Sequence, residues 1–122
     1  CNWRGTTWIP INYMIMHGLL DYGYADVARK LARKTVDLVY KRNEVTREFY
    51  DGESGEGLGL KRFWGWSVLA YVMPFECETG YDPSKLDGSA VRPLGRELFG
   101  LDFPASDDPR PISTHLSQDG LQ

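Results

Sequence analysis

The sequence of 122 residues has little cysteine, no excess of positive charge and no long apolar run. Its two cysteines, Cys1 and Cys77, lack the CxxC or His–Cys spacing of a zinc site and are too few for a disulfide scaffold. We expect reduced, buried thiols, although the sequence leaves a disulfide between them open. His17 and His115 have no ligand partner at a useful spacing. We therefore expect both histidines to be structural and no metal to be bound.

Charge and hydropathy exclude two further classes of partner. The 14 Lys and Arg residues against 17 Asp and Glu give a net charge of −3, which lacks the positive footprint of a nucleic-acid-binding protein. The longest nearly apolar run, residues 66–75, is far short of the roughly 20 residues that span a bilayer. We expect no nucleic-acid and no membrane partner. Without a signal peptide in these residues, the compartment stays unknown, with the cytoplasm slightly favoured.

The first half of the sequence predicts two helices. Apolar residues at every fourth position from Ile11 to Leu19 indicate a helix over residues 10–21, ended by Gly23. A second helix from about residue 24 to 42 has a basic face, which we interpret as a solvated surface. Its apolar stripe consists of Tyr24, Val27, Ala28, Leu31, Thr35, Leu38 and Val39.

The middle of the sequence combines a glycine-rich segment with a strongly apolar one. Residues 43–62 contain four glycines in eight positions and predict a loop that lies on the surface or lines a cavity. Residues 66–73 are apolar nearly all round, which is typical of a helix buried inside something larger. Because little of this short chain is left to surround such a helix, and because the sequence opens on a motif without an initiator Met, we expect a fragment of a longer protein.

The last third of the sequence has a different character. Asp-Pro, Arg-Pro and Phe-Pro pairs mark turns after Pro74, and residues 51–122 hold 6 Lys and Arg against 12 Asp and Glu. We therefore divide the chain into a helical part, residues 1–76, and an irregular, acidic and Pro-rich extension, residues 77–122. A short extended hairpin is expected around residues 90–101.

Three clusters of aromatic and charged residues carry the chemistry. They lie at residues 2–8, 48–51 and 64–67, each at an expected helix end, where a rigid scaffold can present them to one pocket. Indole rings stack on the apolar face of a pyranose, while carboxylates and a guanidinium pair with its hydroxyls. Residue types alone therefore suggest a carbohydrate site.

The order and spacing of these clusters resemble glycoside hydrolase family 63. The first is similar to that family's WRGPxW…NY segment, the second to its E-x-Y-[DN]-P-x-T-G segment and the third to its closing Trp-[Ser/Thr] helix start. The matching residues are Trp3-Arg4-Gly5-x-x-Trp8-x-Pro10-x-Asn12-Tyr13, Glu48-Phe49-Tyr50-Asp51-x-x-x-Gly55-Glu56-Gly57 and Phe63-x-Gly65-Trp66-Ser67. The resemblance covers about residues 2–73. Relatives include α-glucosidases and mannosylglycerate and glucosylglycerate hydrolases, with trehalases more distant.

This resemblance implies an all-α fold in which the chain supplies the C-terminal helices of an (α/α)6 barrel. It also implies an inverting hydrolase of α-glucosides or α-mannosides that needs no metal or organic cofactor. Glu48 matches the family's general base, whereas the general acid is an Asp upstream of the Trp-Arg-Gly motif. We therefore expect the missing N-terminal part of the same polypeptide to be a partner of this chain, and the fragment alone to be inactive.

The resemblance suggests further substrate contacts around Glu48. Trp3 and Trp8 are predicted to stack on the sugar, the alternative being ordinary core indoles. Arg4 is predicted to donate a hydrogen bond to substrate or to a site carboxylate, the alternative being a structural ion pair. Tyr50 is a weaker candidate for the pocket.

Other residues near these motifs are assigned as follows. Trp66 is predicted to line the pocket, although a buried helix needs large apolar residues in any case. Asp51 is interpreted as a turn residue. The nearby carboxylates, which rival Glu48 for the role of base and which we expect to be solvated, are Glu44, Glu53 and Glu56.

Departures from the family pattern keep alternatives open. Gly52 stands where Pro is usual, which loosens the turn. The sugar is therefore undetermined, and a trehalase-like specificity is the enzymatic rival. The rival from another class is a non-catalytic carbohydrate-binding or interaction module.

Overall fold

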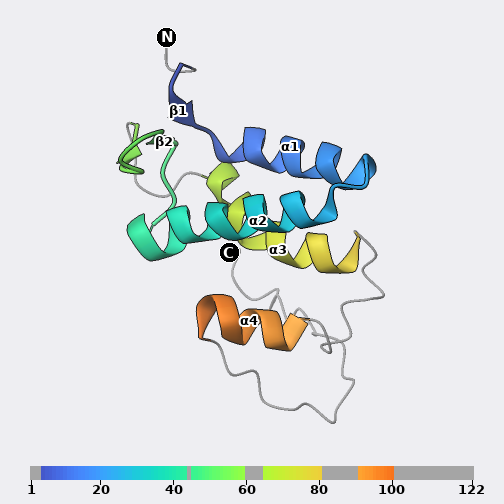
Figure 1. Cartoon of the computed structure of the whole chain (residues 1–122). Helices are drawn as coiled ribbons and strands as arrows, with labels where there is room; N and C mark the ends of the chain where they lie inside the picture. Colours follow the sequence, from blue (N-terminus) through green and yellow to red (C-terminus); the bar gives the residue numbers. More distant parts are fainter. Residues whose placement is uncertain (1–3, 44, 60–64, 81–90, 101–122) are drawn as a thin grey trace, which may run out of the picture.

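A computed structural model describes residues 4–43, 45–59, 65–80 and 91–100 (Figure 1). This part of the chain is mainly helical, which confirms the predicted all-α class and agrees with helices of an (α/α)6 barrel. The elements, in chain order, are strand β1 (Thr6–Thr7), helix α1 (Ile9–Asp21), helix α2 (Ala25–Val36), π-helical turn η1 (Asp37–Lys41), strands β2 (Phe49–Asp51) and β3 (Gly57–Leu58), 3₁₀ turn η2 (Gly65–Val68), helix α3 (Leu69–Thr79) and helix α4 (Val91–Phe99).

Helix α2 packs against both α1 and α3 (Figure 1). Two alanines on α2, Ala28 and Ala32, are fully buried and allow the neighbouring helices to approach closely. We call the cluster they belong to the Met73 core; its buried members are Met16, Ala28, Ala32, Met73 and Cys77. Burial of this apolar surface is what joins the three helices.

The first two helices begin and end close to the predicted positions. Pro10 lies in the first turn of α1, where the missing N–H needs no partner, and Gly23 adopts a φ of +82° just beyond the helix. The predicted stripe of α2 is wrong at its start, because Tyr24 and Val27 are 59% and 52% exposed. The buried face is shifted because α2 lies between two helices instead of covering one.

Residues 43–59 form more structure than the predicted loop. The short strands β2 and β3 make an antiparallel hairpin, and β1 adds to it from the start of the chain in the order β1-β2-β3. Thr6 is opposite Asp51, and Phe49 is opposite Leu58. Strands of two or three residues are too short to show an alternating pattern, so the sequence did not indicate them.

Helix α3 continues past Pro74, after which we had predicted turns and irregular structure. Pro74 lies inside the helix and is buried, and the helix ends only at Gly80, which has a φ of +60°. An internal proline costs roughly 3 kcal/mol. Met73 and Cys77, on either side of it, are buried in the Met73 core, and their burial offsets this cost.

The hairpin expected around residues 90–101 is wrong, because Val91–Phe99 is helix α4. Pro93 lies in the first turn, where backbone N–H groups have no helical partner, and Gly100 follows the helix with a φ of +65°. Leu94 and Leu98, four residues apart, are both buried. The division of the chain at residue 76 stays a prediction. In the part that the structure describes, no helix is both long enough and apolar enough to cross a membrane.

Candidate functional site

The three motif segments meet in one aromatic cluster. The ring of Trp8 stacks on Phe49, with centroids 4.9 Å apart and planes at 23°. The ring of Trp66 lies against the same indole at 5.8 Å and 58°. One ring comes from each of the three segments that the sequence comparison with family 63 singled out, so residues more than 55 positions apart share a single site.

The two indoles of this cluster differ in exposure. Trp8 is 7% exposed, and its Nε1–H donates to the hydroxyl of Thr6 at 2.9 Å. Trp66 is 40% exposed, and its Nε1–H donates to the backbone carbonyl of Glu48 at 2.9 Å. Trp66 is therefore the more accessible ring of the pair, and Trp8 packs against it. The sugar contacts of both residues stay predictions.

Glu48 lies at the entrance of β2, directly beside Trp66. The residue is half-buried, and its side chain lies against Gly59, which has a φ of +102°. A Cβ atom at position 59 would stand 2.5 Å from both Cβ and Oε2 of Glu48. Only glycine at position 59 therefore leaves room for this placement of the carboxylate. Its role as general base stays a prediction.

Tyr50 is completely buried beneath this segment. It forms a second core with Ile9, Val39 and Ala70, in which burial raises the pKa of the Tyr50 hydroxyl. That hydroxyl accepts a hydrogen bond from the backbone N–H of Arg47 at 3.0 Å. Tyr50 thus supports the backbone next to Glu48. Its predicted contact with sugar stays a prediction.

The Trp-Arg-Gly segment is joined to the hairpin through two glycines. The N–H of Gly52 donates to the carbonyl of Gly5 at 3.0 Å, and a Cβ at position 52 would stand 2.2 Å from that oxygen. A proline there would lack the donor as well as the space. Gly52 therefore forms a close backbone contact. Our expectation that it simply loosens the turn is wrong.

Asp51 and Asn43 complete the hairpin. Asp51 Oδ1 accepts hydrogen bonds from the N–H and the hydroxyl of Ser54 and from the N–H of Glu53. These bonds lower the pKa of that carboxyl and confirm the interpretation of Asp51 as a turn residue. Asn43 Nδ2 donates to the carbonyls of Leu38 and Gly55, and its Oδ1 accepts from Gly57 N–H. Asn43 thereby ties the end of η1 to the hairpin. The position of an Asn just beyond a helix was a usable signal that we did not interpret.

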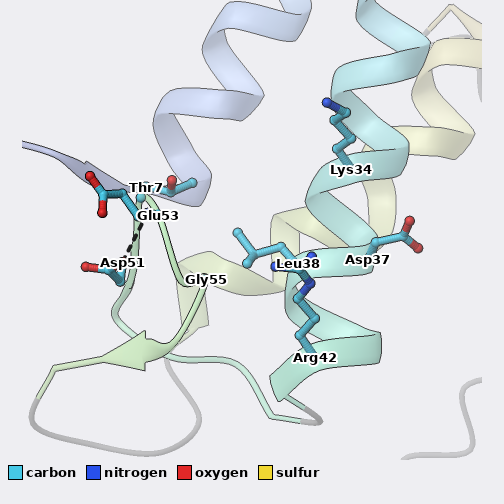
Figure 2. A pocket seen from close by; sticks show the side chains of 9 residues that line it. Thr7, Lys34, Asp37, Leu38, Arg42, Asp51, Glu53 and Gly55 are labelled. Carbon is cyan, nitrogen blue, oxygen red and sulfur yellow. Dashed lines mark hydrogen bonds between the residues drawn. The ribbon is translucent and has the colours of Figure 1, made fainter.

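A separate cavity of about 390 Å³ lies between the hairpin and η1 (Figure 2). In Figure 2, Asp51 and Glu53 lie on the hairpin side, and Lys34, Asp37 and Arg42 lie on the helical side. Its lining carries charges of both signs, and Glu48 is not among its residues. The cavity shows no single preference for an anionic or a cationic ligand.

The remaining predicted residues fall into three groups. Arg4 is exposed, and so are Glu53 and Glu56, as expected for solvated carboxylates. Trp3, Glu44, Cys1 and His115 lie outside the described residues. Cys77 is a buried free thiol, as expected, and among the described residues no three His, Cys, Asp or Glu side chains are grouped to hold a metal ion.

His17 has the structural surroundings that we expected. Its Nε2 lies 3.4 Å from Oε2 of Glu76, and its ring lies 4.3 Å from that of Tyr13. The hydroxyl of Tyr13 donates to the same carboxylate at 3.1 Å. These contacts join α1 to α3 away from the aromatic cluster.

Comparison with known proteins agrees with the motifs. The model of the mannosylglycerate hydrolase MGH1-like glycoside hydrolase domain matches residues 1–67. Mannosylglycerate hydrolases from Thermus thermophilus and Rubrobacter radiotolerans are 42% identical over 66 residues and 39% identical over 72. These matches cover 54% and 58% of this chain but only 15% and 16% of the relatives. The mannosyl-oligosaccharide glucosidase GCS1 of Arabidopsis thaliana is 30% identical over 87 residues, 61% of this chain and 10% of that protein.

No solved structure gives a significant match. The family model nevertheless covers more than half of the chain and includes Glu48, Tyr50 and Trp66. The chain therefore belongs to the mannosylglycerate hydrolase MGH1-like glycoside hydrolase domain family.

Proposed function

We propose that this chain is the C-terminal part of the catalytic (α/α)6 domain of an inverting glycoside hydrolase acting on an α-glucoside or α-mannoside. The observation that carries the proposal is the convergence of the three motif segments on Glu48 and Trp66. The names of the relatives, mannosylglycerate hydrolases and glucosidases, support these two classes of sugar.

Apolar surface on the helices supports the proposal that further helices complete the domain. Several large apolar side chains of α1, η2 and α3 are at least 36% exposed and are available for packing against further chain. They are Ile11, Met14, Ile15, Val68 and Val72. We propose that an upstream part of the same polypeptide covers them and supplies the catalytic acid.

Glu48 is proposed as the general base. Its carboxylate would take a proton from a water molecule as that water attacks the anomeric carbon. An upstream Asp would protonate the leaving oxygen from the opposite side, with the two carboxyl groups roughly 6.5–9.5 Å apart to admit the water. This chemistry needs neither a metal nor an organic cofactor. The chain by itself, lacking the acid, is expected to be inactive.

Around Glu48 we assign the substrate contacts by exposure. Trp66 offers the stacking surface, and Arg4, which is also exposed, donates to a sugar hydroxyl. Trp3 is retained as a second stacking ring. Trp8 and Tyr50 act mainly beneath the site, because both are buried.

The first experiment is to sequence the DNA upstream of the Cys1 codon. An open frame with further helical pairs and an acidic candidate would support the proposal. A stop codon or a start signal just before Cys1 would contradict it.

The second experiment tests the base in the complete domain. Glu48→Gln should lower turnover by roughly 10²–10⁴-fold while leaving sugar affinity and folding largely unchanged, because only proton abstraction is lost. Glu53→Gln, an exposed carboxylate five residues away, is the matched control. Near-normal turnover of the Glu48 variant would exclude it as the base. An assay of the complete domain on trehalose distinguishes a trehalase-like specificity from one for other α-glucosides or for α-mannosides.

A non-catalytic carbohydrate-binding module is the second candidate, favoured by the exposed ring of Trp66 on a rigid aromatic cluster. In that case the 122-residue chain would bind sugar without any partner. Titration of the 122-residue chain with α-glucosides and α-mannosides, followed by indole fluorescence, separates the two functions, because only the binding module would bind sugar alone. Trp66→Ala is the control variant and should abolish such binding.

A further inference from the structure

We infer that Ser67 is a positioning residue for Glu48, acting with Trp66 and Tyr50 to fix the backbone on both sides of that carboxylate. The inference rests on the proposed function, since it assigns a task to residues that support the proposed base. It gives a role to Ser67, for which the sequence analysis predicted none.

Two consecutive side chains of η2 donate hydrogen bonds to the backbone carbonyls of two consecutive residues. Ser67 Oγ–H donates to the carbonyl of Arg47, and Trp66 Nε1–H donates to the carbonyl of Glu48. These oxygens belong to the two peptide planes that flank the Cα of Glu48. Because peptide groups are planar, holding both planes restricts φ and ψ of Glu48 and therefore the direction of its Cα–Cβ bond.

Arg47 is held at both of its backbone polar groups. Its N–H donates to Tyr50 Oη at 3.0 Å, and its carbonyl accepts from Ser67 Oγ–H. The two hydroxyls come from different elements, β2 and η2, so the backbone that leads into Glu48 is fixed from two sides.

Burial assigns Ser67 to positioning and not to substrate contact. Ser67 is 0% exposed, so its hydroxyl does not face solvent. The absence of a side chain at Gly59 leaves room for the Glu48 carboxylate. The placement of Glu48 thus depends on a buried contact from Ser67 and a partly exposed one from Trp66.

The activity test compares Ser67→Ala with Thr79→Val in the complete domain. Thr79 Oγ1 also bonds a carbonyl, that of Phe75 at 3.0 Å, and the residue is also buried, but it lies far along α3 from Glu48. Since small misplacements of a catalytic group cost up to roughly 10²-fold, Ser67→Ala should lower kcat about 10- to 100-fold with KM changed less than about twofold. Ser67→Thr, which keeps the hydroxyl, should restore most of the rate.

Equal kcat in the two variants, or a change confined to KM, would overturn the inference. If Glu48→Gln itself leaves turnover intact, the proposed function fails, whereas an effect of Glu48→Gln without one of Ser67→Ala removes only the positioning role.

A second measurement is independent of activity and can be made even if the Ser67 variant does not fold. In the 122-residue chain, the amide of Arg47 should be protected from hydrogen exchange. Tyr50→Phe, which keeps the ring and removes the acceptor, should raise its exchange rate at least about tenfold relative to helical amides of α2. An unchanged rate would show that the hydroxyl contacts to Arg47 do not hold this segment, and would overturn the inference.

Discussion

The Met73 core and the surroundings of Glu48 are held together by different chemistry. In the Met73 core, three helices meet through apolar side chains and two alanines. Around Glu48, polar side chains reach backbone groups instead, as Asn43, Ser67 and Trp66 all do. The difference follows from secondary structure. A helix satisfies its own backbone, whereas short loops need side chains to do so.

This comparison separates stability from the geometry of the site. The contacts of the Met73 core are broad and non-directional, so a change there should alter the free energy of unfolding. The contacts around Glu48 are directional and local, so changes there should chiefly move particular groups. Three predictions concern this contrast.

The largest effect on stability is expected in the Met73 core. Met73→Ala should lower the free energy of unfolding by about 2–5 kcal/mol, because a fully buried side chain is lost and a cavity remains. Urea denaturation of the 122-residue chain measures it. Its matched control is Val72→Ala, at the adjacent position but 40% exposed, which should change the value by less than about 1 kcal/mol. Equal losses of unfolding free energy in the two variants would show that the Met73 core does not dominate the stability of the chain.

The same core should make stability depend on alkaline pH. Burial raises the pKa of the Cys77 thiol from 9.0 to about 11. The folded chain therefore retains a proton that the unfolded chain gives up, so this contribution is complete below pH 9 and is lost as pH rises towards 11. The expected loss is on the order of 2 kcal/mol.

Comparison with Cys77→Ala isolates this effect, because the buried tyrosines contribute with the same sign in both proteins. Urea midpoints measured between neutral and alkaline pH should fall more steeply with the thiol present. Parallel curves would contradict the pKa shift.

A pair of glycines should show effects of opposite sign. Gly52→Ala should destabilise the chain by about 1–3 kcal/mol, because its Cβ would overlap the Gly5 carbonyl. Gly18→Ala should stabilise it by about 0.5–1 kcal/mol, since that Cβ meets nothing within 4 Å and alanine favours the helix. Thermal melts of both variants test this opposition of sign. Shifts in the same direction would show that the close contact between Gly5 and Gly52 is absent.

Helix formation was largely readable from local signals. Pro10 and Gly23 marked helix ends, and the composition of residues 24–42 specified an amphipathic helix, because these preferences act within a few residues. Val91–Phe99 carried the same kind of signal in Pro93 and Gly100, but the surrounding turn residues obscured it. Motif order also pointed to the family that the comparison shows.

Tertiary structure decided what local preference could not. The exposure of Tyr24 and Val27, the continuation of α3 through Pro74 and the stacking of Trp8 on Phe49 each depend on partners distant in sequence. The support of Glu48 by Ser67 is of the same kind. By itself the sequence determined which segments become helices and which residue types the site contains. Only packing decided which faces are buried and which hydroxyls meet which carbonyls, because burial and hydrogen bonding are settled between segments and not within them.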